Sequence, residues 1–341
     1  MPPSSFYSAL LAIDVNDDFR QIEWDADVAD DCRQIVRLAI REDLDRSYDW
    51  TTVALVPQDA RGSAKVVARG SGVLAGLPAL QLVLDEFHAN VTLTSQLADG
   101  EALEPGETIA VLEGAVRDLL TAERTLLNLL GRLSGIATLT RRYVEAVAGT
   151  KARIYDTRKT TPAWRRLEKY AVRCGGGHNH RLGLFDAVLI KDNHLAFANA
   201  NSIPRGDDVG VAAVAAAVRQ ARKLLQANAG RTTTGDGPAR VEVPSLVEVE
   251  VDTLDQLAEA LPAGPDIVLL DNMSRDDLRS AVAVRDATAP GVELEASGGV
   301  TLATVAELAA TGVERISVGA LTHAATSLDV ALDWALDWVR D

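Results

Sequence analysis

The hydrophobic residues beyond residue 150 gather in short runs that are separated by stretches with helical spacing or by turns. Six runs are of this kind: RIYD, FDAVLIKD, LVEVEVD, DIVLLDN, VELEAS and ERISVGA. Regular alternation of strands with helices predicts a parallel sheet. Since a closed barrel of this type needs eight strands, we expect an irregular, incomplete α/β barrel over residues 128–321.

Capping and turn residues indicate where the helices between these strands begin. Pro162 suits the first position of a helix and Ser274 suits an N-cap, and further helices are expected from Thr253 and Thr301. An alanine-rich helix is expected near residues 211–227. The polar sequence after it, up to residue 239, has the composition of a mobile loop.

The pattern is different before residue 128. Residues 25–46 carry apolar side chains at a helical period, and short β-rich runs bounded by glycines follow from Ser63 onward, with one helix among them. We expect an α/β sandwich domain over residues 25–127, preceded by a loose extension over residues 1–24. A C-terminal helix over residues 322–341 is expected to pack back onto this domain.

Residues 116–148 are apolar nearly all round a helix, which predicts a long helix buried between domains or subunits. Gly131 and Gly135 within it indicate either close packing or a break. Arg124 belongs to the same helix, and a buried arginine needs an anionic partner. Glu123 or Asp118 could be that partner.

Composition excludes several classes of protein. No 18-residue apolar run could span a bilayer, and the start lacks the basic region of an export signal, so we expect a cytoplasmic protein without membrane association. The two cysteines, Cys32 and Cys174, are too few for a metal site of their own or an oxidised scaffold. A pI near 4.8 disfavours nucleic acid as a partner.

Positive charge is concentrated in one stretch, residues 156–194. It contains eight Lys or Arg against four Asp or Glu, a net +4 that leaves −19 for the rest of a chain whose total is −15. Three of the five histidines lie there too. Such a cluster suits a small polyanion. Arg165, Arg166, Lys169 and Arg173 have the spacing of a helix face held by salt bridges, which is the simpler interpretation for those four.

Other polar residues follow the predicted strands, and the carboxyl ends of barrel strands build the site in such folds. They are Arg158, Lys159, Lys191, His194, Glu248 or Glu250, Asp271, Ser297, Gly298, Gly299 and Gly319. Glycines after the last two strands let backbone amides approach a phosphate, helped by the helix from Thr301. Glu250 and Asp271 would suit Mg²⁺ bridged to phosphate, or an internal salt bridge with Lys or Arg. Lys191 could instead form a Schiff base, as in barrel aldolases.

Several segments together resemble the quinolinate phosphoribosyltransferases, from about residue 25 to the end of the chain. They are ERTLLNLLGRLSGIATLT, DTRKTTPAWRRLEKYAVRCGGGHNHRLGLFDAVLIKDNH, VEVEVDTLDQL, DIVLLDN, EASGGV and SVGALTHA. The resemblance implies a sandwich domain joined to an irregular barrel, with sites at a homodimer interface. It implies conversion of quinolinate and phosphoribosyl pyrophosphate into nicotinate mononucleotide, CO2 and pyrophosphate, with Mg²⁺, in NAD biosynthesis.

The resemblance also implies roles for individual residues. Quinolinate would be held by Arg158, His180, Arg181 and Lys191, with Arg124 supplied by the partner subunit, while His194 would line the pocket. Lys159, Glu250 and Asp271 would act on the pyrophosphate and its metal. Ser297, Gly298, Gly299, Gly319 and His323 would surround the ribose 5-phosphate. The chain departs from the family pattern at Ala163-Trp164, where a glycine is common after the proline.

The implied substrate agrees with the charge pattern. Quinolinate carries two adjacent carboxylates, and binding it requires several fixed cations, for which arginine is well suited. Three alternatives stay open at this point: a related phosphoribosyltransferase for another aromatic acid, an aldolase acting through Lys191, and a non-catalytic module that binds a phosphosugar. Release of pyrophosphate would exclude the last of these.

Overall fold

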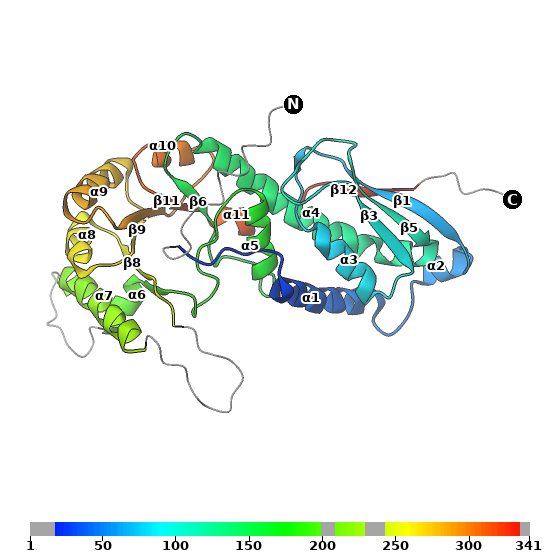
Figure 1. Cartoon of the computed structure of the whole chain (residues 1–341), viewed down its shortest axis with the longest axis horizontal. Helices are drawn as coiled ribbons and strands as arrows, with labels where there is room; N and C mark the ends of the chain where they lie inside the picture. Colours follow the sequence, from blue (N-terminus) through cyan, green and yellow to red (C-terminus); the bar gives the residue numbers. More distant parts are fainter. Residues whose placement is uncertain (1–17, 199–208, 229–242, 335–341) are drawn as a thin grey trace.

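The computed structural model describes residues 18–198, 209–228 and 243–334, and Figure 1 shows their arrangement. The C-terminal half is built on a parallel sheet of six strands in the order β6-β11-β10-β9-β8-β7. These strands are β6 (Arg153–Tyr155), β7 (Val188–Ile190), β8 (Val247–Val251), β9 (Ile267–Asp271), β10 (Glu293–Ser297) and β11 (Arg315–Ser317). All six predicted strands are confirmed. Since β6 and β7 are both edge strands, the barrel is open between them, as expected.

Helices lie along the outer side of this sheet (Figure 1). They are α5 (Arg165–Cys174), α6 (Asp192–Ala198), α7 (Val209–Asn228), α8 (Leu254–Ala260), α9 (Arg275–Thr288), α10 (Val305–Ala309) and α11 (Ala320–His323). Thr253 and Ser274 are N-caps, as expected. The helices expected from Pro162 and Thr301 begin later, at Arg165 and Val305. Ala163, with φ +68°, and the turn at 301–304 place these residues outside helical geometry.

Side chains along the parallel strands alternate between the helix-covered face of the sheet and the barrel interior. In β8 the three valines are buried, consistent with the face that packs against helices, and Glu248 and Glu250 alternate with them. Glu293, Glu295 and Ser297 alternate in the same way in β10. One face of the sheet therefore joins the hydrophobic core, and the other carries charged and polar side chains into the barrel.

The N-terminal half is built on an antiparallel sheet in the order β12-β1-β5-β3. The strands are β1 (Arg61–Ala68), β3 (Val91–Ser95), β5 (Thr108–Ala115) and β12 (Val330–Trp334), with β2 (Gly72–Val73) and β4 (Ala102–Leu103) as a separate pair. Helices α1 (Ala26–Leu44), α2 (Trp50–Leu55) and α3 (Leu77–Glu86) complete it. The chain does pack back here, but the helix predicted over 322–341 is wrong over 330–334, which form a strand. Residues 330–334 pair with residues 64–68 at the edge of β1. The backbone hydrogen bonds of this pairing outweigh the helical pattern of the sequence.

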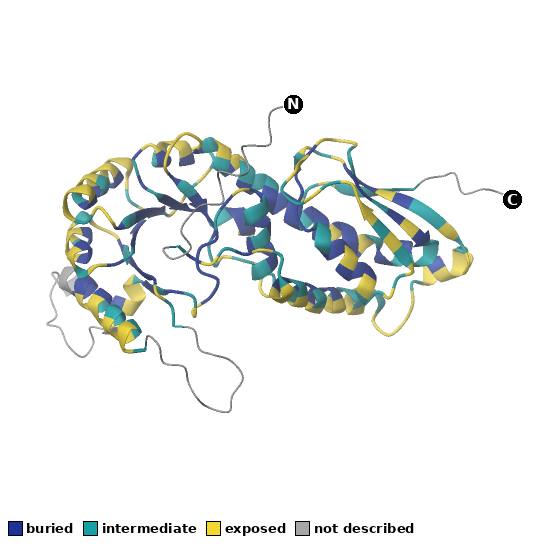
Figure 2. Cartoon of the chain, viewed as in Figure 1, coloured by how far each residue is buried: buried dark blue, intermediate teal, exposed yellow. Residues whose placement is uncertain are grey.

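Helix α4 (Val116–Ala146) joins the two halves and is largely buried, as Figure 2 shows. Of the two interpretations of its glycines, the structure favours close packing. A Cβ on Gly135 would lie 2.0 Å from the carbonyl oxygen of Thr326, and one on Gly131 would lie 2.8 Å from that of Leu328. Both glycines therefore let the chain that leads to β12 cross the helix. None of the described helices combines the length and hydrophobicity needed to cross a bilayer.

The N-terminal extension is not loose where the structure describes it. Phe19 and Ile22 are each only 3% exposed, and Asp18 bonds to Tyr155 and Arg315 inside the barrel. We call residues 18–22 the N-terminal strap. The prediction of a loose extension is therefore wrong for these residues, because buried apolar and ionic contacts hold them. Residues 1–17, most of the predicted loop over 228–239 and the end of the chain from 335 lie outside the described residues.

Candidate active site

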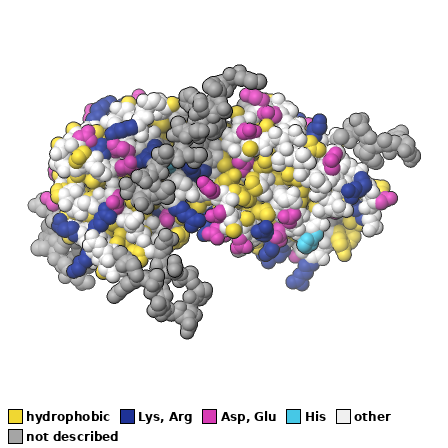
Figure 3. Space-filling view, viewed as in Figure 1, with side chains coloured by type: hydrophobic (Ala, Val, Ile, Leu, Met, Phe, Trp, Pro, Cys, Tyr) yellow, Lys and Arg dark blue, Asp and Glu magenta, His cyan; other side chains and the backbone are white. Residues whose placement is uncertain are grey.

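Three guanidinium groups approach one another at the opening of the barrel. Arg158 follows β6, Arg165 begins α5, and Arg181 precedes β7. Burial lowers the pKa of Arg165 and of Arg181, and the charge of Arg158 lowers both further. The Nε atom of Arg158 is buried and has no hydrogen-bond partner among the described residues. Because like charges this close repel, the cluster suits a ligand with several negative charges. Figure 3 shows Lys and Arg side chains near the junction of the two halves.

Residues 178–181 lie beside β6 in the gap of the barrel. The amide of His178 donates to the carbonyl oxygen of Ile154 at 2.8 Å, and the amide of Asp156 donates to that of His178 at 3.0 Å. This segment therefore extends the sheet by one short parallel bridge. We call this segment the 178–181 loop, and Arg181 lies at its end.

A fully buried ion pair between Asp156 and Lys169 supports this loop from behind. Asp156 also accepts hydrogen bonds from the His180 amide at 2.9 Å and from the Asn179 side chain at 2.7 Å. Lys169 donates to the carbonyl oxygen of His180 at 2.8 Å. Lys169 is thus paired, as the simpler interpretation of that helix face expects, but it is buried rather than exposed.

His180 lies between Arg181 and the barrel interior. Its Nδ1 accepts a hydrogen bond from the Arg181 amide at 2.8 Å, so the ring proton must be on Nε2. Nε2 lies 3.1 Å from Glu248 Oε2 and 3.5 Å from Glu295 Oε1. Burial raises the pKa of Glu295, and the nearby Glu248 carboxylate raises it further. Both ring nitrogens are therefore engaged within the protein, and His180 supports Arg181 from behind.

His180, Glu248 and Glu295 form the group of metal-ligand residues found among the described parts of the chain, with one ligand atom each within 4.8 Å of the others. Coordination through Nε2 would move the ring proton to Nδ1, where it would face the amide N–H of Arg181. Two donors cannot share that contact. The group is better suited to sharing protons than to binding a cation.

A second set of charges lies across the carboxyl ends of β7, β8 and β9. The ammonium group of Lys191 pairs with Glu250, which is the internal salt bridge left open as an alternative to a metal. Burial raises the pKa of Glu250, and the carboxylates of Asp271 and Asp192 add to this against the effect of Lys191. Burial and the same two carboxylates raise the pKa of Asp252. These carboxylates repel one another, and a hard divalent cation that they shared would relieve that repulsion.

The predicted phosphate residues lie after the last two strands. Gly298 and Gly299 have φ values of +95° and +58°, which favour glycine, and a Cβ on Gly298 would lie 2.1 Å from Asn272 Oδ1. Ser297 is the register partner of Asp271. A Cβ on Gly319 would lie 3.0 Å from Lys159 Cδ and 3.4 Å from the His323 ring, so these side chains flank it. The structure thus brings the predicted phosphate and pyrophosphate residues to one edge.

The loop that carries Lys159 is fixed by one buried carboxylate. Glu168 accepts bonds from the amide and hydroxyl of Thr161 at 3.1 and 2.9 Å, and from Arg132 at 2.7 Å. Arg132 also donates to the carbonyl oxygens of Ala325 and Thr322 next to α11. The Thr322 hydroxyl in turn donates to the carbonyl oxygen of Lys159 at 2.8 Å. These contacts connect α4, α5 and α11 behind the loop that carries the exposed Lys159.

Two predicted residues stand apart from these clusters. Arg124 is exposed on α4, between Arg117, which bonds to Val56 in the N-terminal half, and Arg132. His194 is exposed at the start of α6, where its Nδ1 accepts a bond from the Lys191 amide at 3.0 Å. Arg124 thus does not join the guanidinium cluster within this chain.

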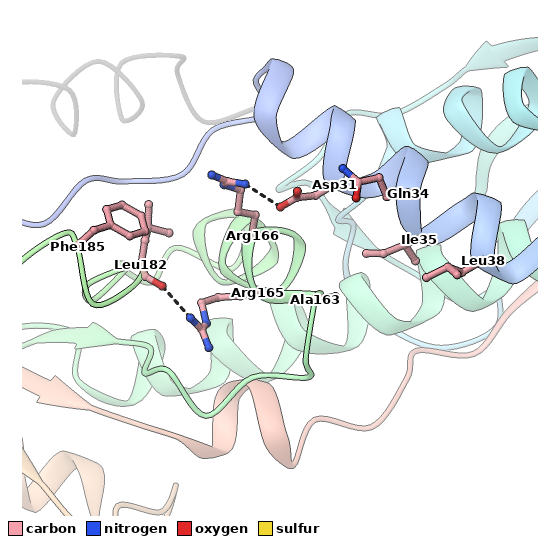
Figure 4. A pocket seen from close by; sticks show the side chains of 9 residues that line it. All are labelled: Asp31, Gln34, Ile35, Leu38, Ala163, Arg165, Arg166, Leu182 and Phe185. Carbon is pink, nitrogen blue, oxygen red and sulfur yellow. Dashed lines mark hydrogen bonds and ion pairs between the residues drawn. The ribbon is translucent and has the colours of Figure 1, made fainter. Parts of the chain in front are cut away.

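A pocket of about 410 Å³ adjoins the 178–181 loop, and Figure 4 shows the side chains around it. Helix α1 forms one side, and Arg165, Arg166, Leu182 and Phe185 form another. Arg166 pairs with Asp31 at 2.9 Å, as the simpler interpretation expects, whereas Arg165 donates to Leu182 O at 3.1 Å.

Sequence reasoning missed Arg165 and Glu295, and it named Glu248 only as an alternative to Glu250. Arg165 has helical spacing like its neighbours, and nothing in the sequence distinguishes it from the paired Arg166. Glu248 and Glu295 did leave a signal, because charges that alternate with buried residues within a strand, as in VEVEV and VELEAS, must face the barrel interior.

The comparisons with known proteins cover nearly the whole described chain. Residues 49–134 match the family described as "Quinolinate phosphoribosyl transferase, N-terminal domain", and residues 136–333 match its "C-terminal domain". The nicotinate-nucleotide pyrophosphorylase (carboxylating) of Mycobacterium leprae is 44% identical over 303 residues, which is 88% of this chain and 96% of the relative. The probable enzyme of the same name from Bacillus subtilis is 40% identical over 79% of this chain and 82% of its own length. The solved nicotinate-nucleotide pyrophosphorylase from Francisella tularensis has a TM-score of 0.78 at 35% identity, covering 93% of this chain and 100% of that chain.

Proposed function

Because the chain belongs to the quinolinate phosphoribosyltransferase family, we propose that its strand-end site transfers a phosphoribosyl group to quinolinate with decarboxylation. The products are nicotinate mononucleotide, CO2 and pyrophosphate, in NAD biosynthesis. The observation that carries this proposal is that Arg158, whose buried Nε has no hydrogen-bond partner among the described residues, lies near both Arg165 and Arg181. A dicarboxylate would relieve the repulsion of Arg158 with each of them. The matches to the family and to its members confirm the resemblance drawn from the motifs at the level of the family.

The residues at the opening of the barrel would hold quinolinate. Arg158 and Arg181 offer guanidinium groups to its two carboxylates, and Arg165 adds a third positive charge beside them. Lys191 would exchange its contact with Glu250 for a carboxylate of the substrate. That exchange would free Glu250 for the other end of the site.

The opposite edge would hold phosphoribosyl pyrophosphate. Gly298, Gly299 and Gly319 leave room for the 5-phosphate, with His323 beside them, and Lys159 lies where it could neutralise the pyrophosphate. Glu250 and Asp271 would hold Mg²⁺, whose chemistry when bound is to neutralise the charge of the departing pyrophosphate. The mutual repulsion of these carboxylates supports the assignment.

The protein's own groups would act mainly by positioning and charge. The pyridine nitrogen of quinolinate attacks the anomeric carbon while Lys159 stabilises the leaving pyrophosphate. The alkylated ring nitrogen is then positive and stabilises the electron pair that stays on the adjacent ring carbon when the carboxylate departs as CO2, and a proton from water then completes that carbon. That step needs no general base, which agrees with a site rich in cations.

Two alternatives can be separated by experiment. The aldolase alternative is disfavoured because the comparisons place the chain in a transferase family and Lys191 is held in an ion pair. A related enzyme for another aromatic acid would need fewer cations if its substrate had one carboxylate. Purified protein with Mg²⁺ and phosphoribosyl pyrophosphate should release pyrophosphate and CO2 with quinolinate, and neither with nicotinate. Equal pyrophosphate release with nicotinate would contradict the proposal.

A homodimer with Arg124 shared across its interface is the remaining part of the proposal. Arg124 is exposed on α4, one helical turn beyond Thr121. The hydroxyl of Thr121 donates to the carboxylate of Asp49, the N-cap of α2, at 3.5 Å, so Arg124 lies near α2. Trp50 and Leu55 on α2 are 67% and 76% exposed, and Phe185 at the pocket is 66% exposed. Apolar side chains this exposed, near Arg124 and near the 178–181 loop, favour coverage by a second subunit.

Mixing two inactive variants tests this arrangement. In a dimer of Arg124→Ala with Arg181→Ala subunits, one of the two sites would contain only native residues. Random association should therefore restore about a quarter of wild-type activity. No recovery in a mixture shown to contain heterodimers would mean that Arg124 does not act across the interface.

A further inference from the structure

The N-terminal strap docks directly on the residue that precedes His180. Gln21 and Asn179 exchange hydrogen bonds, with the Asn179 amide donating to Gln21 Oε1 at 2.8 Å and Gln21 Nε2 donating to Asn179 O at 3.1 Å. The Ile22 amide donates to Asn179 Oδ1 at 2.7 Å. Asn179 is therefore held from one side by the strap and from the other by Asp156.

Phe19 forms one wall of the His180 ring. The two rings stack with centroids 4.3 Å apart and planes inclined by 28°. Phe19 is 3% exposed, and the guanidinium of Arg315 lies 5.0 Å from its ring centroid on the barrel side. An imidazole held between a flat apolar ring and Glu248 has little freedom to rotate.

Asp18 anchors the strap inside the barrel. Its carboxylate accepts bonds from the Tyr155 hydroxyl at 2.6 Å and from Arg315 at 2.8 Å. Arg315 is completely buried and also bonds to Glu293 and Glu295. The position of Phe19 is thus fixed by the charged interior of the barrel rather than by the exposed surface.

We propose that Phe19, anchored by Asp18, is a positioning residue for the acid substrate: it holds the His180 ring so that Nδ1 stays on the amide of Arg181. The proposal rests on the proposed function, because it assigns quinolinate to Arg181. The action passes from Phe19 to His180 to Arg181. Among the described residues, the strap makes no hydrogen bond or ion pair with Lys159, Gly298, Gly299 or Gly319, so we expect the effect to be specific to the acid.

Steady-state kinetics of Phe19→Ala test the proposal. We expect the KM for quinolinate to rise at least about tenfold, while kcat and the KM for phosphoribosyl pyrophosphate stay within about twofold. Arg20→Ala is the matched control, because Arg20 is the exposed neighbour on the same strap and pairs with Asp25. That control should leave all three constants unchanged.

A folded Phe19→Ala enzyme with an unchanged KM for quinolinate would overturn the proposal. So would an equal loss for both substrates, since that is the result of general destabilisation. If the alanine variant does not fold, Phe19→Leu fills most of the same space without the flat ring and should show the same selective rise in KM. Wild-type enzyme that releases no pyrophosphate with quinolinate would instead refute the proposed function itself.

Nitrogen NMR of labelled histidine gives a readout independent of turnover. The chain has five histidines, so His180→Gln would identify the signal of His180. Wild-type protein should show His180 protonated on Nε2 alone, and Phe19→Ala should show exchange between tautomers. An unchanged signal in that variant would mean that Phe19 does not hold the ring.

Discussion

The two ends of the site, to which we have assigned the acid and the phosphates as a proposal, are supported in different ways. Behind Arg181, the Asp156–Lys169 pair is fully buried, and the 178–181 loop is held by hydrogen bonds to that pair and to the N-terminal strap. At the phosphate end, Lys159, Gly298 and Gly299 are exposed. The carboxylates there are crowded, and Lys191 occupies Glu250 until a ligand displaces it.

The difference follows from what each end must bind. Guanidinium groups that repel one another keep their geometry only on a rigid support, because free side chains would turn away into water. Under the proposed function, the phosphate end would admit a large anion with its metal and would release pyrophosphate, so exposed groups and glycine turns suit it. Changes behind the acid end should therefore affect folding, and changes at the phosphate end should affect turnover.

Replacing Lys169 by Met should have the largest effect on stability. It would leave Asp156 buried without its partner, at a cost of about 3–5 kcal/mol in the free energy of unfolding. Urea denaturation would measure this. The matched control is Arg279→Met, which removes the exposed Asp276–Arg279 pair and should cost at most about 1 kcal/mol. If Lys169→Met and Arg279→Met lowered the free energy of unfolding equally, the buried pair would support the structure no more than an exposed pair does.

Replacing Asp271 by Asn should act on turnover instead. We expect kcat/KM for phosphoribosyl pyrophosphate to fall about 100-fold, because a charge that helps neutralise the leaving group is lost. The Mg²⁺ concentration for half-maximal rate should rise, while calorimetry should find the same affinity for quinolinate. Asp276→Asn, on an exposed helix, is the control. Weakened quinolinate binding would mean that the two ends are not separate.

The ion pairs of Glu314 lie outside the candidate site. Changing them should therefore alter the stability of the protein without altering substrate binding. Glu314 accepts bonds from Arg285 at 2.8 and 2.9 Å and from Lys151. Although burial opposes it, these bonds lower the pKa of Glu314 to about 2. A carboxyl group whose pKa is lowered by folding stabilises the folded protein at pH values above its unfolded pKa of 4.5. That contribution to the free energy of unfolding is lost as the pH falls towards 2.

Glu314→Gln should therefore cost about 1–2 kcal/mol at pH 7, after allowance for partial solvent exposure. The difference from wild type should narrow as the pH falls below 4.5, while the KM for quinolinate at pH 7 stays the same. Denaturation curves at several pH values would check this. A difference that does not change with pH would contradict the assigned cause.

Ala163 offers the smallest test, at the exposed end of the loop before α5. Its φ of +68° is strained for alanine and free for glycine. The relief is partly offset by the greater freedom of glycine in the unfolded chain, so Ala163→Gly should stabilise the protein by about 0.5 kcal/mol. Activity should not change. A lower melting temperature for Ala163→Gly than for the wild type would contradict the backbone strain assigned to Ala163.

Much of the fold could be predicted from local pattern. All six parallel strands were found because hydrophobic runs and turn residues agree there, and Ser274 marks its helix start because N-capping is a local interaction. The C-terminal strand β12 was missed because its conformation depends on pairing with β1, more than 250 residues earlier. Similarly, Asp18 and Phe19 gain their place from Arg315 and His180, which no local pattern connects to them.

The candidate site divides in the same way. Residues that end strands, such as Lys191 and Asp271, were predicted because parallel strands end at one edge. Arg165 was missed because its role depends on the direction of its side chain relative to Arg158. The pairing of Lys191 with Glu250 was one of two open alternatives, since spacing alone does not decide between a metal and an ion pair.

Calorimetric titration of Arg181→Ala with quinolinate tests the central claim most directly. That claim is that guanidinium groups fixed by a buried support bind the acid. The account predicts that quinolinate binding is lost in this variant, while binding of phosphoribosyl pyrophosphate with Mg²⁺ and the melting temperature remain close to those of the wild type. Unchanged affinity for quinolinate would contradict it.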